Sequence, residues 1–222
     1  MDTTLERLLE CVEFGKINQA AGYPPQMKGQ LGADEYTVEA LEKGITPNDI
    51  MNKALIPAMN KVGQKFTENK IFVPQMLLSA KAMNASMEHL KPFFTSGEVK
   101  RKGTFILGTV FGDLHDIGKN LVGMMVEGAG WEVIDLGIDV KTEKFIETLQ
   151  QHPTAVVGLS ALLTTTMTNM EPIIKAIKDI SSNTKVIVGG APLTKEFADS
   201  IGADAYGKDP QESINWSETV VV

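Results

Sequence analysis

Short apolar runs alternate with helical stretches over the second half of the chain, and this alternation constrains the fold more than any other feature. The runs suited to β-strands are residues 104–110, 132–136, 155–159, 185–188 and, more weakly, 204–206. Amphipathic stretches lie between them, at about 118–129, 142–151, 168–181 and 194–201. This alternation predicts a Rossmann-like, doubly wound parallel sheet of five strands.

The first 95 residues have the periodicity of helices instead. Residues 2–15 place their apolar side chains on one face, the spacing of a helix that packs on a core. Further helices are predicted over 34–43, over 72–94, and from the Thr46-Pro47 start signal to about Phe66, with Pro57 expected to kink the last of these. Helices of this number and length predict a four-helix bundle.

A polar segment separates the two patterns. Residues 96–103 are rich in charged side chains and include glycines at 97 and 103, a composition typical of an interdomain linker. We therefore predict a helical cap domain over residues 1–95, a linker over 96–103 and a Rossmann-like domain over 104–222.

Charge and cysteine content exclude several classes of function. The formal net charge of −7 argues against non-specific binding to nucleic acid or to an anionic membrane. The N-terminus is acidic and unlike a secretory signal, and no run reaches the ~18 apolar residues of a membrane helix. The single cysteine, Cys11, permits no internal disulfide. We therefore expect a cytoplasmic protein.

Unusual residues follow the predicted strands, at the sheet edge where α/β proteins bind ligands. Residues 112–120 follow the first strand, 160–165 the third, 189–192 the fourth and 207–210 the fifth. His115 lies in the first of these loops between two carboxylates, Asp113 and Asp116. Imidazole is a common metal ligand, and a carboxylate often orients its second nitrogen. Asp113 could do so here, with Ser160 extending the chain of hydrogen bonds.

Each of these residues also has an ordinary structural interpretation. His115 could be a solvated loop histidine, and the two carboxylates could cap a helix that begins near Ile117. The paired glycines 189 and 190 could form a tight turn. The functional interpretation therefore depends on the combination.

That combination resembles the signature of cobalamin-binding domains, Asp-x-His-x-x-Gly, then Ser-x-Leu, then Gly-Gly. The chain contains Asp113-Leu-His115-Asp-Ile-Gly118, then Ser160-Ala-Leu162, then Gly189-Gly190. The stretch FTENKIFVPQMLLSAKAM resembles the helical cap of corrinoid proteins in methyltransferase systems, and the matching region of cobalamin-dependent methionine synthase. The resemblance covers nearly the whole chain and is weakest at residues 17–33.

The resemblance implies roles for individual residues. In the family, the nucleotide tail of the cofactor leaves cobalt and enters a slot in the sheet domain, and a histidine replaces it (base-off/His-on). His115 would be this axial metal ligand, with Asp113 and Ser160 as its proton-linked partners. The remaining cofactor-binding residues implied for the sheet domain are Gly112, Asp116, Ile117, Gly118, Leu162, Thr164, Gly189 and Gly190. Thr164 would contact the tail, and the two glycines would leave room for it.

In the cap, Phe66 and Val73 match positions that shield the methyl group, and Asn52 matches a corrin-contacting position more loosely. Pro210 stands where the family usually has a smaller residue. Substrate access would require the cap to swing aside on the 95–103 segment.

The implied activity is methyl transfer by a carrier subunit that is not a complete catalyst alone. Cob(I)alamin takes a methyl group and methylcobalamin gives it away, which makes or breaks the contact between His115 and cobalt. Because the chain has no separate substrate or folate domain, we expect donor-side and acceptor-side methyltransferases as partners, with a corrinoid-reactivating protein. The acceptor would be a folate-type pterin or a thiol, and methylamines, methanol, betaines and aryl methyl ethers are all open as donors.

Three other interpretations compete with this one. His115-Asp116 also matches the His-Asp signature of HD phosphohydrolases, but those are all-helical and need further histidine and aspartate ligands. A flavodoxin-like or receiver-like module would suit the sheet but not the helical cap. A cobalamin-dependent sensor that does not transfer methyl groups would need a signalling or DNA-binding domain, and residues 1–45 contain no basic recognition helix.

Overall fold

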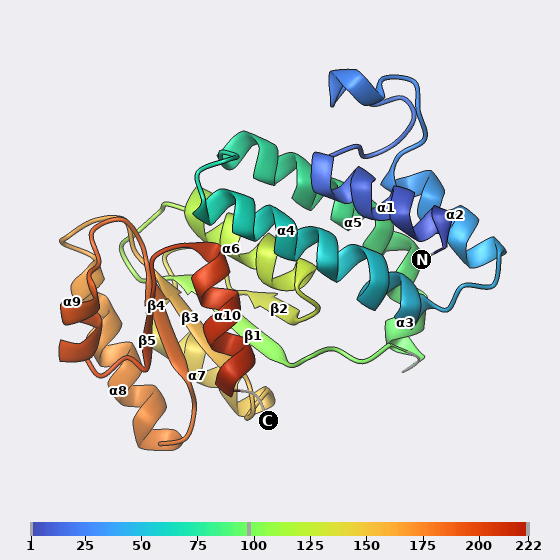
Figure 1. Ribbon diagram of the computed structural model, residues 1–222. Coiled ribbons are helices and arrows are strands. Elements are labelled where there is room, and N and C mark those ends of the chain that lie inside the picture. The colour runs from blue at the N-terminus through green and yellow to red at the C-terminus, as the bar shows by residue number, and fades with distance from the viewer. Residues whose placement is uncertain (1, 97–98, 221–222) are drawn as a thin grey trace. The chain divides into compact units, whose positions relative to one another are not determined.

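The computed structural model describes residues 2–96 and 99–220 and divides into two compact units (Figure 1). The first comprises the chain up to Arg101 together with residues 128–130, and the second comprises residues 102–127 and the chain from Trp131 onward. The boundary at Arg101 falls within the predicted linker, of which residues 97 and 98 lie outside the described part.

The first unit is helical. Its α-helices are α1 (Thr3–Phe14), α2 (Ala33–Glu42), α3 (Pro47–Ile50), α4 (Ile56–Thr67) and α5 (Val73–Thr95). Helix α1 begins where the Asp2 carboxylate accepts a hydrogen bond from the Thr4 N–H, and it ends at Gly15, whose φ of 74° suits glycine. Its apolar face, including Leu8 and Val12, is fully buried. The helical periodicity of the sequence therefore marks the core of this unit.

Pro57 changes the predicted third helix. A π-helical turn over Met51–Leu55 (η2) joins α3 to α4, so the helix continues in three pieces. Pro57 lies in the first turn of α4 and has no N–H to donate to the preceding turn. A π-helical turn displaces the ladder of hydrogen bonds by one residue. The disturbance expected at Pro57 thus takes the form of a π turn.

The second unit contains a five-stranded sheet in which every pair of neighbouring strands is parallel. Its strands are β1 (Thr104–Thr109), β2 (Glu132–Asp135), β3 (Val156–Ser160), β4 (Val186–Gly189) and β5 (Ala205–Gly207), in the order β2-β1-β3-β4-β5. Parallel pairing places all the carboxyl ends at one edge. The predicted fold, a helical region followed by a Rossmann-like parallel sheet, is confirmed.

Alternate strand residues face opposite sides of the sheet. Ile106, Val157 and Val188 belong to a buried cluster with residues of α7 (Thr142–Gln151), α8 (Met170–Ile180) and α9 (Lys195–Ser200). Phe105, Leu107 and Ile187 lie on the other side, toward α6 (Ile117–Gly128) and α10 (Pro210–Val220). Burial on both faces explains why these strands are continuously apolar in sequence.

Helix α10 is not among the helices predicted from the sequence. Two of its buried residues are serines, Ser213 and Ser217, whose hydroxyls donate to backbone carbonyls four residues earlier. Serine on the inner face weakens the apolar periodicity by which a helix is recognised. Among the described residues, no helix is long and apolar enough to span a membrane.

Candidate functional site

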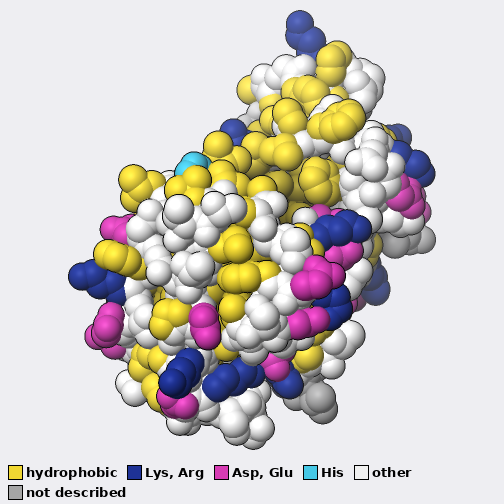
Figure 2. Space-filling model, turned by 90° about the vertical axis from the view of Figure 1, so that its left-hand side faces the viewer, with side chains coloured by type: hydrophobic (Ala, Val, Ile, Leu, Met, Phe, Trp, Pro, Cys, Tyr) yellow, Lys and Arg dark blue, Asp and Glu magenta, His cyan; other side chains and the backbone are white. Residues whose placement is uncertain are grey.

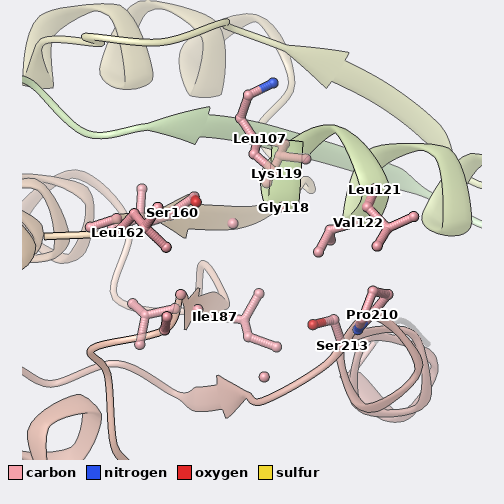
Figure 3. A pocket seen from close by; sticks show the side chains of 18 of the residues that line it. Leu107, Gly118, Lys119, Leu121, Val122, Ser160, Leu162, Ile187, Pro210 and Ser213 are labelled. Carbon is pink, nitrogen blue, oxygen red and sulfur yellow. The ribbon is translucent and has the colours of Figure 1, made fainter. Parts of the chain in front are cut away.

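A deep cavity opens at the carboxyl edge of the sheet in the second unit. It has a volume of about 720 Å³ and is lined by residues from the loops after β1, β3, β4 and β5. In Figure 3, Leu121 and Val122 of α6 face Pro210 and Ser213 of α10 across this cavity, and Ile187 of β4 lies to the left of Ser213. The cavity therefore lies at the sheet edge where the sequence predicted a ligand site.

Small residues leave the cavity open. A Cβ atom at Gly118, in the first turn of α6, would meet no other atom within 4 Å, so any side chain there would project into open space. Lys119 also lines the cavity, but in Figure 3 its ammonium group points away from the centre. That ammonium is buried and donates to Asp135 and Asn120, which fixes the start of α6. The slot itself is thus mainly apolar.

His115 lies at the mouth of this cavity and is held by Asp113. The His115 Nδ1 atom is 2.7 Å from Asp113 Oδ1, and the same oxygen accepts a hydrogen bond from the His115 N–H at 3.1 Å. The Asp113 side chain is fully buried, whereas half of the His115 side chain is exposed. The carboxylate is therefore a fixed support, and the imidazole is the group that a ligand can reach.

The state of Asp113 determines which nitrogen of His115 is free. Burial alone would raise the pKa of Asp113, but hydrogen bonds from Thr166, from the Leu162 N–H and from His115 outweigh it and hold the pKa well below its usual range. An ionised carboxylate can only accept, so Nδ1 carries the proton. In neutral imidazole, Nε2 then presents its lone pair, as a metal ligand must.

Thr166, which the sequence did not suggest, takes the place proposed for Ser160. Its hydroxyl donates to Asp113 Oδ2 at 2.6 Å, and the Leu162 N–H donates to the same oxygen at 2.8 Å. Within the described residues no hydrogen bond joins Ser160 to Asp113, although Ser160 does line the cavity. Thr166 is the last of three consecutive threonines, and the sequence does not show which of their hydroxyls reaches the carboxylate. The turn that begins α8 places the hydroxyl of Thr166 there.

The paired glycines serve close packing of backbone. A Cβ at Gly190, where φ is 135°, would lie 1.8 Å from the Ala161 carbonyl oxygen, and a Cβ at Gly189 would lie 3.0 Å from the Gly207 carbonyl oxygen. Both glycines line the cavity, but these Cβ positions are blocked by the backbone of the loop after β3 and of the end of β5. The pair therefore lets the end of β4 approach the loop after β3 and the end of β5 closely.

Some of the other residues that the resemblance implies line the cavity, and others do not. Asp116, Ile117, Gly118 and Leu162 line the cavity, whereas Gly112 and the exposed Thr164 do not. The Asp116 carboxylate accepts a hydrogen bond from the Asn120 side chain.

Exposed apolar side chains occur in the loop that carries His115 and in the loop after β3. Leu114 is 68% exposed and Ile117 is 72% exposed, and Phe111, Leu162 and Leu163 are also exposed. Single hydrophobic side chains reach the surface elsewhere, as the space-filling view shows, and need no explanation (Figure 2). What distinguishes Leu114, Ile117 and Leu162 is that they line the same cavity as His115. Such a rim is expected where an apolar ligand binds.

The cap residues lie in the first unit. Phe66 and Val73 are half-buried and flank the turn between α4 and α5. Asn52 is exposed and lies in the π-helical turn, and its side chain donates to Asn48. Asn52 and Phe66 are 14 positions apart, which corresponds to roughly 20 Å along a helix. The structure thus groups Phe66 with Val73 and separates both from Asn52.

The described residues contain no group of three or more histidine, cysteine or carboxylate side chains able to hold a metal ion. His115 would therefore be a single protein ligand, which suits a metal whose other donors come from a macrocycle. The long apolar slot and the exposed apolar rim fit the nucleotide tail and corrin ring of cobalamin.

Comparison with known proteins agrees with this chemistry. A B12 binding domain family matches residues 103–215, and a second B12 binding domain family matches residues 30–91. Trimethylamine corrinoid protein 1 of Methanosarcina acetivorans is 39% identical over 86% of this chain and 90% of its own length. Dimethylamine corrinoid protein 1 of the same organism is 40% identical over 80% of this chain and 84% of its own length.

A solved structure agrees as well. The methanol:cobalamin methyltransferase complex MtaBC from Methanosarcina barkeri matches with a TM-score of 0.82 and 26% identity, over 99% of this chain and 80% of the matched chain. The chain therefore belongs to the B12-binding family of corrinoid proteins, and its cofactor is cobalamin. The resemblance to corrinoid proteins of methyltransferase systems is confirmed.

Proposed function

We propose that this chain is a methyl carrier that binds cobalamin base-off, with His115 as the axial ligand of cobalt. The observation that carries the proposal is the half-exposed imidazole of His115, held through Nδ1 by a buried, ionised Asp113 at the mouth of an apolar slot. When bound, cobalamin supplies a cobalt centre that can accept a methyl group and give it up. The protein supplies binding, orientation and protection.

Different residues of the second unit would perform these functions. Asp113 holds the ring of His115 so that Nε2 faces outward, and Thr166 stabilises the Asp113 carboxylate by donating to it. Gly118 leaves the slot open for a nucleotide tail, and the exposed side chains of Leu114 and Ile117 offer an apolar seat for the ring. Ser160, Leu162 and Asp116, which line the cavity, are further proposed contacts.

We assign the upper face of the cofactor to the first unit. Phe66 and Val73 would shield the methyl group, and Asn52 is a separate and looser candidate for a corrin contact. The 95–103 segment would let the cap domain move aside for substrate. These assignments rest on the resemblance of the cap sequence to that of other corrinoid proteins.

The partners follow from the role of carrier. A donor-side methyltransferase would load the methyl group, and an acceptor-side methyltransferase would pass it to a folate-type pterin or a thiol. A reactivating protein would restore oxidised cofactor, and the complex would work in the cytoplasm. The trimethylamine and dimethylamine relatives are 39–40% identical, against 26% for the methanol complex, which favours a methylated amine as donor.

The ligand assignment is tested by electron paramagnetic resonance of the full chain loaded with cob(II)alamin. Labelling histidine with ¹⁵N distinguishes a protein nitrogen on cobalt from the benzimidazole nitrogen of the cofactor. We expect the nitrogen splitting to change from three lines to two on labelling. His115→Ala should abolish the change, whereas His152→Ala, at the end of α7, should not. A splitting unaffected by the label would overturn the proposal.

The carrier role needs a second measurement. The reduced, cobalamin-loaded chain is mixed with a methyltransferase specific for trimethylamine or dimethylamine and its substrate, and with the methanol enzyme in parallel. We expect the absorption spectrum of the methylated cofactor to form with an amine and not with methanol. Failure with every donor would leave a cobalamin-binding module that transfers no methyl group, which is the sensor alternative.

A further inference from the structure

The loop that carries His115 is held from two sides. Residues 111–116, the ligand loop, connect β1 to α6 without regular secondary structure. Strand β1 lies between β2 and β3 in the sheet, so the loops that follow these two strands flank the ligand loop. Each of them sends one polar side chain to the ligand-loop backbone: Asp139 from the loop after β2, and Asn169 from the segment after β3.

Asp139 forms two hydrogen bonds with the ligand loop, one through its side chain and one through its backbone. Its Oδ1 accepts the Gly112 N–H at 2.7 Å, and its own N–H donates to the Asp113 carbonyl at 3.0 Å. Its φ is 54°, a left-handed conformation that aspartate and asparagine adopt more readily than other non-glycine residues. Within the described residues its carboxylate forms no ion pair. The only side-chain hydrogen bond that Asp139 makes there is the one to the ligand loop.

Asn169 makes the contact on the other side. Its amide nitrogen, Nδ2, donates to the Phe111 carbonyl at 2.8 Å. It lies one turn after Thr166, whose hydroxyl donates to the Asp113 carboxylate. The start of α8 thus holds both the backbone and the side chain of the ligand loop.

We propose that Asp139 and Asn169 are positioning residues that fix residues 111–113 from both sides, so that the His115–Asp113 pair is set for cobalt before cobalamin binds. The inference rests on the proposed role of His115. A loop that is ordered only on binding loses conformational freedom at that moment, whereas a loop ordered beforehand does not. Groups that orient a metal ligand typically change metal affinity by roughly 10- to 100-fold.

The test compares four variants of the full chain. Asp139→Gly removes the acceptor without straining the backbone, and Asp139→Asn keeps both an acceptor oxygen and tolerance of the left-handed conformation. Asn169→Ala removes the donor. Thr168→Ala is the matched control, because among the described residues the Thr168 hydroxyl donates only to the Thr165 carbonyl in its own turn.

Two properties are measured, hydrogen exchange of the Gly112 N–H in the cofactor-free chain and the dissociation constant for cobalamin. In Asp139→Gly we expect exchange to accelerate by up to about 10-fold, the value of one net hydrogen bond, and cobalamin binding to weaken by about 10-fold. Asp139→Asn should restore both values. Asn169→Ala should weaken cobalamin binding, and Thr168→Ala should change neither property.

Two results separate this inference from the proposed function. If Asp139→Gly and Asn169→Ala bind cobalamin as the parent does, the positioning role is overturned, whatever the exchange rate of Gly112. If the parent chain itself shows no histidine nitrogen on cobalt, the role proposed for His115 fails instead.

Discussion

The hydroxyl of Thr166 donates a 2.6 Å hydrogen bond to the buried carboxylate of Asp113, and the two residues are 53 positions apart in the sequence. The bond links the β1–α6 loop to the turn that begins α8. It is one of the hydrogen bonds that keep Asp113 ionised although it is buried. A carboxylate held in this way imposes one tautomer and one orientation on His115.

Replacing Thr166 tests the importance of this hydrogen bond. Thr166→Val keeps the shape of the side chain and removes the donor, so the second unit should lose about 1–3 kcal/mol, because a buried acceptor loses a partner. Cobalamin binding should weaken by roughly 10-fold as His115 becomes less constrained. Urea unfolding of the cofactor-free chain and titration with cobalamin measure the two effects.

Thr166→Ser supplies the control because it keeps the hydroxyl and should behave nearly as the parent. Ser160→Ala distinguishes the two candidate hydroxyls, since Ser160 lines the cavity without bonding to Asp113. A larger loss of cofactor-free stability in Ser160→Ala than in Thr166→Val would contradict the structure.

The same bond shows what the sequence could predict. His115 and Asp113 are two residues apart after a strongly apolar strand, so local pattern was sufficient to pair them. Thr166 reaches Asp113 only because β1 and β3 are neighbours in the sheet and α8 begins with a short turn. Distant side chains that meet through the fold leave no periodic signal in the sequence.

The apolar pattern of the sequence likewise determined which helices and strands could be predicted. The strands of the sheet were predicted to within one residue at each end, because continuous apolar runs mark buried strands. Helix α10 was missed because Ser213 and Ser217 occupy its buried face and satisfy their hydroxyls within the helix.

Gly118→Leu should close the slot without harming the fold. The added side chain projects from the first turn of α6 into open space, and replacing a helical glycine stabilises the helix by up to about 1 kcal/mol. We therefore expect a melting temperature equal to or above that of the parent and cobalamin binding weakened at least 10-fold, about 1.4 kcal/mol. Absorption titrations measure the binding.

Cobinamide, a corrinoid without the nucleotide tail, is the control ligand for this variant, and its binding should be affected much less. Gly22→Leu is the matched control variant, since a Cβ there also meets no atom within 4 Å and Gly22 lies in the first unit. Equal losses for cobinamide and cobalamin would show that Gly118 does not border the tail.

Phe66→Ala should expose the bound methyl group to solvent. Phe66 flanks the turn between α4 and α5, where the cap sequence resembles the shielding segment of other corrinoid proteins. Without its ring, the fragments formed by light should escape more readily, so photolysis of bound methylcobalamin should accelerate severalfold. Phe14→Ala, another partly exposed phenylalanine of the first unit, is the control. Equal photolysis rates for the two variants would contradict the shielding role.

The ionisation of Glu13 should make the stability of the first unit depend on pH. Its carboxylate is only 9% exposed and accepts hydrogen bonds from Lys65 at 2.5 Å and from Lys61 at 3.2 Å. Burial would raise the pKa of Glu13, but the two ammonium groups outweigh it, and the pKa lies below its ordinary value of 4.5.

Because the folded chain favours the ionised form of Glu13, the stabilisation is complete well above pH 4.5 and is lost as the pH falls through the lowered pKa. Glu13→Gln should therefore cost the first unit about 1–2 kcal/mol at pH 7, between the values for an exposed ion pair and for a charged hydrogen bond. The cost should shrink as the pH falls below 4.5. Glu10→Gln, which removes an exposed pair with Arg7, should cost little at any pH. Urea unfolding of the three chains from pH 7 to pH 3 measures these differences, and a cost for Glu13→Gln that grew on acidification would contradict the assignment.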